Sequence, residues 1–528
     1  MDKSLMIKEG KTALGIEFGS TRVKAVLIGE DFIPLASGGY EWENKLEGGY
    51  WTYSLDEVHT ALKTSFSALK KDVKEKYGCE LTTVGAIGIS AMMHGYLAFD
   101  KNGKLLVPFR TWRNTTTGEA AEKLTEALGF NIPQRWTSAH TYQAILSKEE
   151  HVSEIAYVTT LAGYVHYMLT GVNAVGVGEA SGIFPIDSET LDYDEKMVES
   201  FDSLTAKEGF GKKLREIYPK VLNAGADAGC LTEKGALLLD ESGILQAGIP
   251  FAPCEGDAGT GMTATNSVRK RTGNVSAGTS VFAMLVLEKS LSKVYPEIDM
   301  VTTPDGAPVA MVHCNNCTGD INAWGGLFTE FARAIGCDIP KGKVFDLMYE
   351  KALEGDADCG GLMSYNYFSG EPVTGLMEGR PMFLRTPDSS FTLGNFMRAH
   401  LYSAMAALKV GADLLFEGEK VEIDELYGHG GYYIYPGVGQ KITAAALGTP
   451  VSVMKTAGEG GPYGMALLAS YRINGNGMTL PEFLSEKVFK GAECVCVDPD
   501  EETMAGFKAY TEKYVKGLDC QKAAIKCI

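Results

Sequence analysis

The sequence lacks any long apolar run. Its longest apolar stretches, such as Val281 to Leu287, are far shorter than the roughly 20 residues that a membrane-spanning helix needs. The first eleven residues are polar and lack the apolar core of a signal peptide. We therefore expect no membrane partner and a cytoplasmic location.

Basic residues are also scarce relative to acidic ones. Lys and Arg number 49 against 67 Asp and Glu, which gives a formal net charge of -18. This excess argues against a general affinity for nucleic acid. It is compatible with a phosphate site, because such a site needs only a few converging N–H groups and at most one nearby cation.

Motifs for common metal and nucleotide sites are missing. The eight histidines have no zinc-binding spacing, and the eleven cysteines are spaced irregularly, which favours reduced thiols over a disulfide framework. Gly10-Lys11-Thr12 ends like a P-loop, but position 5 is a leucine rather than the required glycine. Cys314 and Cys317 have Cys-x-x-Cys spacing without a second pair, so two free thiols are favoured and an iron–sulfur site stays an alternative.

The length and composition predict two large globular domains of α/β type. The chain has 528 residues, of which 45% are hydrophobic and 22% charged, typical of packed proteins. Apolar residues recur with helical periodicity between predicted strands. The main helical stretches are Leu55 to Tyr77, Gly118 to Leu128, Tyr157 to Leu169 and Phe396 to Phe416.

One pattern of strand, tight turn and strand occurs twice. It covers residues 13–28, followed by a third strand at 32–37, and returns at 273–287. The two Gly-Ser-Thr or Gly-Thr-Ser turns begin at Gly19 and Gly278, so they lie 259 residues apart (278 − 19), near half the chain. The spacing indicates a duplication, with chance as the alternative, and predicts domains at 1–265 and 266–528.

A second pair of segments supports the duplication. A strand predicted from Gly248 leads to Glu255-Gly256-Asp257 and a helix of small residues at 258–264. A strand predicted from Gly448 leads to Glu459-Gly460-Gly461 and a helix at 463–471. Asp257 stands at a predicted helix start, where an aspartate serves either as a helix cap or as a chemical group.

The two turns are candidate phosphate sites. Each turn brings backbone N–H groups and two hydroxyls toward one point, as a phosphate requires. A single turn of this kind is more often an ordinary hairpin turn without a ligand. Two copies facing each other across an interdomain cleft would form a pair of phosphate clamps. Their residues are Gly19, Ser20, Thr21, Gly278, Thr279 and Ser280. The glycine-rich segment containing Gly430 and Gly431 would let the backbone approach an adenine or ribose.

Together these motifs resemble the FGGY family of carbohydrate kinases. The segments 15–21 and 276–280 are similar to its two phosphate motifs, and 428–431, 448–451 and 459–466 to its adenosine motif. The resemblance spans most of the chain and implies two ribonuclease H-like domains of the actin, hexokinase and Hsp70 superfamily with an interdomain ATP cleft. It further implies an ATP-dependent sugar kinase that uses Mg²⁺, with a homodimer as a possible assembly.

The same resemblance implies roles for single residues. Asp257 would accept the proton of the attacking sugar hydroxyl. Met93 and His94, in a Met-His-Gly triplet, resemble the substrate loop of the family's xylulose kinases, and Trp112 would line the sugar site. Glu17 stands where the family usually has an aspartate near the magnesium, so Glu17 and Asp257 would hold Mg²⁺, in part through water.

Several departures from the family pattern concern the substrate. Asn114 and Thr116 stand where xylulose kinases usually have Asp and Arg, and Ala258 replaces a common asparagine. Asn114 is still expected to bind sugar hydroxyls. The preferred acceptor is D-xylulose, giving D-xylulose 5-phosphate, with ribulose, glycerol and gluconate as alternatives. Two other classes of protein remain as alternatives. One is a non-kinase ATPase or activator of the actin-like superfamily, and the other is a catalytically silent sensor.

Overall fold

The computed structural model describes residues 2–454 and 460–528. Contacts divide these residues into two compact units. The first comprises 2–268, 299–309 and 460–491, and the second comprises 269–298, 310–454 and 492–528. The division predicted at residue 265 treats each domain as one continuous segment, whereas the two contact units exchange segments along the chain.

The first unit contains a five-stranded sheet in the order β13-β6-β1-β2-β3. Strands β1 and β2 are antiparallel, as are β2 and β3, which confirms the predicted meander. Strands β6 and β13 continue the sheet parallel to β1. The third strand runs further along the chain than the predicted 32–37. The bounds are β1 Ala13–Phe18, β2 Arg22–Ile28, β3 Pro34–Glu41, β6 Ala86–Ala91 and β13 Glu255–Gly256.

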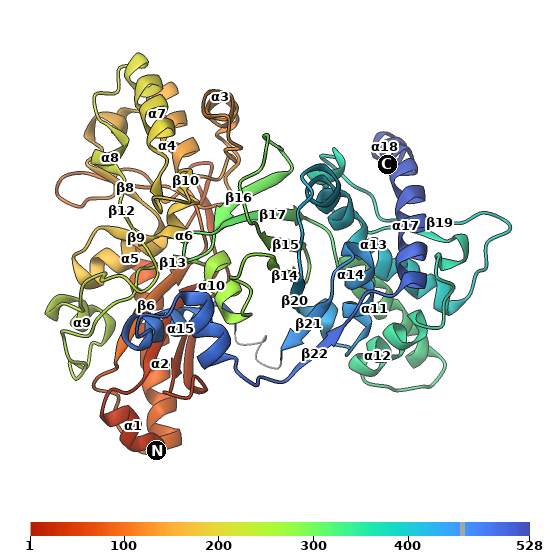
Figure 1. Cartoon of the computed structure of the whole chain (residues 1–528), viewed down its shortest axis with the longest axis horizontal. Helices are drawn as coiled ribbons and strands as arrows, with labels where there is room; N and C mark the ends of the chain where they lie inside the picture. Colours follow the sequence, from red (N-terminus) through yellow and green to blue (C-terminus); the bar gives the residue numbers. More distant parts are fainter. Residues whose placement is uncertain (1, 455–459) are drawn as a thin grey trace. The chain divides into compact units, whose positions relative to one another are not determined.

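Two helices pack against opposite faces of this sheet. Helix α2 (Leu55–Tyr77) lies against Gly38, where a Cβ atom would come within 2.2 Å of the Ser65 carbonyl oxygen. Helix α15 (Gly460–Asn474) lies against Gly15, where a Cβ atom would come within 2.1 Å of the Pro462 carbonyl oxygen. The strand register places Gly15 and Gly38 on opposite faces, so the two glycines allow close packing on both sides. Figure 1 labels both helices near β6 of this sheet.

The prediction of one helix from Tyr157 to Leu169 is wrong at its start. Residues Tyr157–Thr159 form β8, which pairs antiparallel with β7 (Leu97–Phe99), and α5 (Leu161–Thr170) follows. The Thr160 side chain accepts a hydrogen bond from the Gly163 N–H at 3.3 Å. This N-cap sets the start of the helix after a strand whose pairing was not evident from the sequence.

The remaining elements of the first unit surround the sheet and the helices already named. The helices are α1 Lys3–Lys8, α3 Gly118–Leu128, α4 Thr137–Leu146, α6 Val177–Ala180, α7 Glu195–Lys207, α8 Leu214–Ile217, α9 Glu233–Leu239, α10 Asp257–Ala264 and α16 Leu480–Phe483. The short strands are β4 Lys45–Glu47, β5 Tyr50–Thr52, β9 Ala174–Gly176, β10 Ile186–Asp187, β11 Asp192–Tyr193 and β12 Lys220–Leu222. The prediction for α3 is confirmed in both bounds.

A seven-stranded sheet has the order β16-β17-β15-β14-β20-β21-β22. Strand β14 is antiparallel to β15 and parallel to β20, which is parallel to β21. The order β21-β20-β14-β15 therefore repeats the order β13-β6-β1-β2, as a duplicated fold requires. The bounds are β14 Thr272–Ala277, β15 Val281–Val286, β16 Ile298–Thr302, β17 Pro308–Cys314, β20 Glu425–His429, β21 Val451–Met454 and β22 Cys494–Val497.

The second unit has α13 as its central helix. It spans Leu393–Asp413, close to the predicted 396–416, and nearly all its residues through Leu408 are buried. The other helices are α11 Gly319–Ala334, α12 Lys341–Ala352, α14 Val438–Leu447, α17 Glu501–Lys516 and α18 Leu518–Cys527, and a short sheet joins β18 Met363–Tyr365 to β19 Met382–Leu384. Throughout the described parts of the chain, every helix is too short or too polar to cross a membrane.

Candidate functional site

The carboxyl ends of three parallel strands meet at one edge of the first unit's sheet. The register places Glu17 of β1, Ser90 of β6 and Glu255 of β13 at one level. The chain then leaves β6 toward Met93 and leaves β13 at Asp257. Three predicted site residues from distant parts of the sequence, Glu17, Met93 and Asp257, are thus brought to the same edge, where α/β sheets usually bind ligands.

Asp257 is the first residue of α10. Gly256 occupies the N-cap position, and Oδ1 of Asp257 accepts a hydrogen bond from the Met93 N–H at 3.3 Å. The residue is exposed to solvent, yet the mass of surrounding protein raises the pKa of its carboxyl, an effect that the Met93 hydrogen bond opposes. An accessible carboxylate with a raised pKa beside a substrate loop is suited to general base catalysis.

The loop 93–95, which the sequence predicts to bind the substrate, has an unusual backbone. His94 has a φ of 69°, in the left-handed region that non-glycine residues seldom adopt, and the following Gly95 has a φ of 92°. His94 Nδ1 lies 3.2 Å from the Gly182 carbonyl oxygen, and its ring stacks on Trp136. Burial lowers the pKa of His94 to about 3, so its imidazole is neutral at physiological pH. Strain of this kind is common at functional sites.

Small residues allow this loop to pack closely. A Cβ atom on Gly256 would lie 2.2 Å from Cγ of Met93, and one on Gly182 would lie 2.7 Å from Nδ1 of His94. Neither position tolerates a side chain without moving the loop. The loop therefore has a defined position relative to the first turn of α10.

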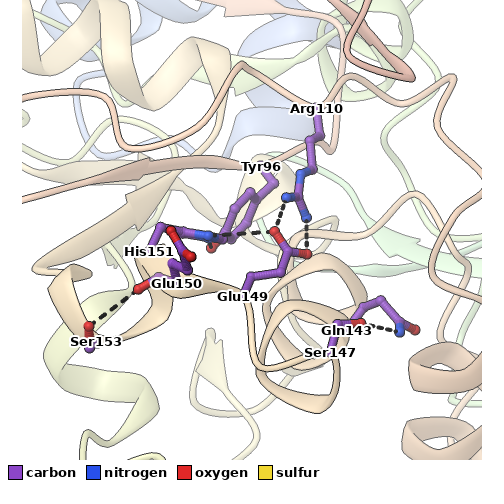
Figure 2. A network of polar contacts seen from close by, with 8 residues as sticks. All are labelled: Tyr96, Arg110, Gln143, Ser147, Glu149, Glu150, His151 and Ser153. Carbon is purple, nitrogen blue, oxygen red and sulfur yellow. Dashed lines mark hydrogen bonds and ion pairs between the residues drawn. The ribbon is translucent and has the colours of Figure 1, made fainter.

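A buried polar network holds the residue that follows the loop (Figure 2). The Tyr96 hydroxyl lies 2.8 Å from Nε2 of His151, whose Nδ1 lies 3.5 Å from a Glu149 oxygen. Arg110 pairs through both terminal nitrogens with Glu149 and exchanges two backbone hydrogen bonds with Tyr96. Reasoning from the sequence did not identify this network, because no spacing connects its members.

Glu17 lies beside Asp257 at the same sheet edge. Burial raises the pKa of Glu17 to about 8, and the negative charge of Asp257 adds to this effect, while Lys24 opposes it. A Cβ atom on Gly461 would come within 2.4 Å of Oε1 of Glu17, so a side chain there would displace the Glu17 carboxylate. Two neighbouring carboxylates form an oxygen donor set that fits Mg²⁺.

The donor set is incomplete by itself. Outside the undescribed residues 455–459, the structure has no group of three or more His, Cys, Asp or Glu side chains arranged to hold a metal ion. Magnesium usually keeps several waters and binds substrate phosphates through the rest of its shell. Glu17 and Asp257 are therefore consistent with a site that water and phosphate complete.

The first predicted phosphate turn is held by aromatic side chains. The indole N–H of Trp42 donates to the Gly19 carbonyl at 2.7 Å, and the Tyr53 hydroxyl donates to the Ser20 carbonyl at 2.5 Å. The indole N–H of Trp112 lies 3.3 Å from the Ser20 hydroxyl oxygen, and 38% of Trp112 is exposed. Trp112 thus lies next to the turn with part of its ring available. Thr21, the last residue of the turn, is exposed.

The predicted substrate residue Asn114 is fully engaged by the protein. Its Oδ1 accepts from the Trp51 N–H at 2.9 Å, and its Nδ2 donates to the carbonyls of Trp51 and Thr111 at 2.9 and 3.0 Å. The side chain is buried, whereas Thr116 is exposed. A role of Asn114 in sugar binding stays a prediction, and in this structure the amide joins its own loop to β5.

In the second unit, the second predicted phosphate turn lies beside the glycine-rich segment. Because β14 and β20 are parallel, Ala277 and His429 end at the same edge. Gly430 has a φ of 100°, and a Cβ atom there would lie 2.5 Å from the Ala277 carbonyl oxygen. Gly431, by contrast, faces open space.

The carbonyls of this turn are tied to the start of α11. The N–H and hydroxyl of Thr318 donate to the Gly278 carbonyl at 3.0 and 2.7 Å, and the Cys317 N–H donates to the Thr279 carbonyl at 2.9 Å. The Gly278 N–H donates to Ser280 within the turn at 2.9 Å. The sequence thus identified the turn but not the segment that supports it.

Other side chains near the glycine-rich segment belong to the core of this unit. Tyr432 donates to the Leu401 carbonyl at 2.9 Å, and Tyr433 lies 3.1 Å from the Thr443 hydroxyl. Cys314 and Cys317 are buried free thiols, and burial raises the pKa of both. Of the predicted adenosine motif, Glu459 lies outside the described residues.

Reasoning from the sequence missed several charged residues of the first unit. Glu255 accepts hydrogen bonds from the N–H groups of Gly178 and Glu179 at 3.3 and 2.9 Å, and burial raises its pKa to about 8. Arg135 forms an ion pair with Asp299. The contact between Glu255 and residues 178–179 ties β13 to α6 across a long sequence separation, which no local pattern reveals.

A duplicated α/β fold with glycine-containing turns and an accessible carboxylate at the sheet edge defines the actin- and hexokinase-like class of phosphotransferases. Residues 12–263 match the N-terminal domain, and residues 273–473 the C-terminal domain, of the FGGY family of carbohydrate kinases. The chain belongs to this family and is an ATP-dependent carbohydrate kinase. The fold class predicted from the sequence is thereby confirmed.

Individual relatives agree with this assignment. The chain is 24% identical over 415 residues to a xylulose kinase from Haemophilus influenzae, covering 76% of this chain and 79% of that one. It is 22% identical over 252 residues to a glycerol kinase from Thermococcus gammatolerans, covering 44% of this chain and 50% of that one. The fold is similar to a crystal structure of a xylulose kinase from Lactobacillus acidophilus, with a TM-score of 0.76, 16% identity and coverage of 96% and 98%.

Proposed function

We propose that this kinase phosphorylates a ketopentose, with D-xylulose as the preferred acceptor and D-xylulose 5-phosphate as the product. The observation that carries the proposal is the hydrogen bond between Met93 and Asp257, which links the Met-His-Gly loop to the candidate base. The similarity to a xylulose kinase over most of both chains supports the same acceptor.

Asp257 acts as the general base in the proposed mechanism. It accepts the proton of the terminal hydroxyl while that oxygen attacks the γ-phosphoryl group of ATP, and ADP leaves. The raised pKa of its carboxyl suits this role, because a base stronger than an ordinary aspartate accepts the proton more readily. The neutral His94 and the backbone of the substrate loop orient the sugar without adding charge.

The two turns and the glycine-rich segment are the proposed nucleotide-binding segments. Gly19, Ser20 and Thr21 belong to one turn, and the open space beside Gly278 and Gly431 is compatible with a nucleotide. Mg²⁺ would supply charge neutralisation of the phosphate oxygens, and Glu17 and Asp257 are the residues that would hold it. Binding between the two units, a homodimer and a cytoplasmic location belong to the proposal and rest on the family resemblance.

A sugar screen tests the function directly. ADP release from purified protein with ATP and Mg²⁺ is measured with D-xylulose, D-ribulose, glycerol and gluconate. We expect D-xylulose to give a kcat/KM at least about tenfold above the others, the size of discrimination that a few hydrogen bonds provide. Activity with glycerol or D-ribulose and none with D-xylulose would disprove the acceptor and leave the kinase assignment intact.

A further inference from the structure

The segment that precedes α4 holds the C-terminal end of the substrate loop through hydrogen bonds. The Gly95 N–H donates to the Arg135 carbonyl at 3.2 Å, and the Thr137 hydroxyl donates to the Gly95 carbonyl at 2.7 Å. At the first end of the loop, Met93 is bonded to Asp257. Arg135 and the candidate base are therefore attached to the same three-residue loop.

The guanidinium of Arg135 has a fixed position with donors to spare. One terminal nitrogen pairs with Oδ2 of Asp299, whose Oδ1 accepts from the Asn131 amide at 3.3 Å. The side chains of Arg135 and Asp299 are 25% and 14% exposed, so the pair is partly buried but reachable. Within 2–454 and 460–528, the Nε and Nη1 groups of Arg135 have no hydrogen-bond partner.

The positive charge of Arg135 acts on both ends of the candidate site. It opposes the rise in the pKa of Asp257 and adds to the fall in the pKa of His94, although desolvation by the surrounding protein is the larger influence on each. The side chain expected to contact the sugar on sequence grounds, Asn114, is meanwhile occupied by Trp51 and Thr111.

We propose that Arg135, held by Asp299, is a specificity-determining residue of the acceptor site, where it donates hydrogen bonds to oxygens of the sugar other than the one phosphorylated. The inference rests on the proposed sugar kinase function and deepens it. A planar guanidinium held in place presents its N–H groups at fixed angles, so it distinguishes sugars by the configuration of their hydroxyls.

The pair also favours a neutral acceptor. Asp299 offsets the charge of Arg135, and the carboxyls of Glu17 and Asp257 lie at the same sheet edge. A carboxylate on the substrate would meet these acidic groups while the charge of Arg135 is already paired with Asp299. The site therefore accepts ketoses or polyols in preference to sugar acids such as gluconate.

Three variants test the proposal with D-xylulose, D-ribulose, glycerol and gluconate at saturating ATP. Arg135→Gln is expected to raise the KM of the preferred sugar about tenfold or more, since hydrogen bonds to charged groups are the strong ones. Arg135→Lys should lose the discrimination between D-xylulose and D-ribulose, which differ in one hydroxyl configuration. Asp299→Asn should raise the relative kcat/KM for gluconate several-fold, because it leaves the guanidinium charge uncompensated.

Control measurements separate this role from a structural one. Arg215→Lys changes an arginine that forms an exposed pair with Asp192 and Glu195 in the same unit, and it should leave all sugar constants unchanged. The KM for ATP should stay within about twofold in the three test variants, because they alter only sugar contacts. An equal fall in kcat for every sugar, with sugar KM values and preferences unchanged, would overturn the proposal.

Two further results separate a failure of the Arg135 assignment from a failure of the proposed function. If the wild-type protein phosphorylates none of the four acceptors, the proposed function fails rather than this assignment alone. If the Arg135 variants do not fold, a crystal structure of the wild type with its sugar decides. A sugar oxygen within about 3.5 Å of Nε or Nη1 of Arg135 supports the proposal, and the absence of such a contact refutes it.

Discussion

The backbone N–H of Met93 donates a hydrogen bond to Oδ1 of Asp257 at 3.3 Å. These residues are 164 positions apart and follow two neighbouring parallel strands, β6 and β13. The contact orients the carboxylate of the candidate base toward the loop that follows β6.

Asp257→Asn tests the role of the carboxylate. The amide oxygen can still accept the Met93 hydrogen bond, so the fold should persist while the base is lost. We expect kcat to fall about 10²-fold or more, with the affinity for ATP little changed. Steady-state kinetics and nucleotide titration measure both, and a near-normal kcat would contradict the assignment of the base.

The pH profile should report the raised pKa of Asp257. The base must be ionised to accept a proton, so kcat/KM falls as the pH decreases through the pKa of this group. Because the mass of surrounding protein shifts that pKa upward from 3.8, the acid limb should lie above the range of an ordinary aspartate. A rate that stays constant down to pH 4, measured with stable protein, would argue against this environment.

Strand and turn patterns allowed much of the first unit's frame to be predicted from the sequence. Alternating and continuous apolar runs predicted strands β1 and β2, and the glycine of the turn predicted the connection between these two strands. The helix from Leu55 to Tyr77 was predicted from its apolar periodicity, and in the structure Ser54 caps its start and Gly78, with a φ of 63°, ends it. Local signals of this kind depend only on neighbouring residues.

The less predictable parts depend on contacts between distant segments. Strand β8 was predicted as helix because its pairing with β7 joins residues about 60 positions apart. The Arg135 and Asp299 pair joins segments 164 positions apart and has no sequence signature. Asn114 was expected to bind sugar because its neighbourhood resembled a family segment, but the position of Trp51 determines what its amide contacts.

The pKa of Glu17 predicts a pH dependence of magnesium binding. With a pKa of about 8, Glu17 is largely protonated at pH 7, and a metal ion must displace that proton. The apparent affinity for Mg²⁺ should therefore increase several-fold between pH 7.5 and about 9, a range in which the phosphates of ATP are already ionised. Kinetic titration of Mg²⁺ at fixed ATP measures this change.

Glu17→Gln provides the matched control for that titration. The amide keeps the size of the side chain but has no proton to release, so the variant should need more Mg²⁺ and should lose the pH dependence. If the wild type and the variant show the same Mg²⁺ requirement at both pH values, Glu17 has no part in holding the metal.

Asn114→Ala distinguishes a structural amide from a sugar ligand. Removing the side chain leaves the Trp51 N–H without its partner, which costs about 1–3 kcal/mol for a buried group, whereas the Trp51 carbonyl keeps the N–H and hydroxyl of Thr111. We expect a lower Tm in thermal unfolding, with the preference among sugars unchanged. A normal Tm together with a changed sugar preference would instead assign Asn114 to the acceptor site.

Two glycines test the packing of α15 in the first unit. A Cβ atom at Gly464 would lie 1.9 Å from the Thr260 carbonyl oxygen of α10, whereas one at Gly261 meets nothing within 4 Å. Gly464→Ala should therefore destabilise the protein by about 2 kcal/mol or more through overpacking. Gly261→Ala should be neutral or stabilise the helix by up to about 1 kcal/mol.

The Gly464→Ala variant should also affect activity. Because Gly464 and Gly461 belong to the same helix and Gly461 packs against Glu17, this variant should weaken Mg²⁺-dependent activity. Equal unfolding midpoints for the two variants in denaturant would show that α10 and α15 can move apart without a cost in the free energy of unfolding. The close contact between these helices would then not position the site.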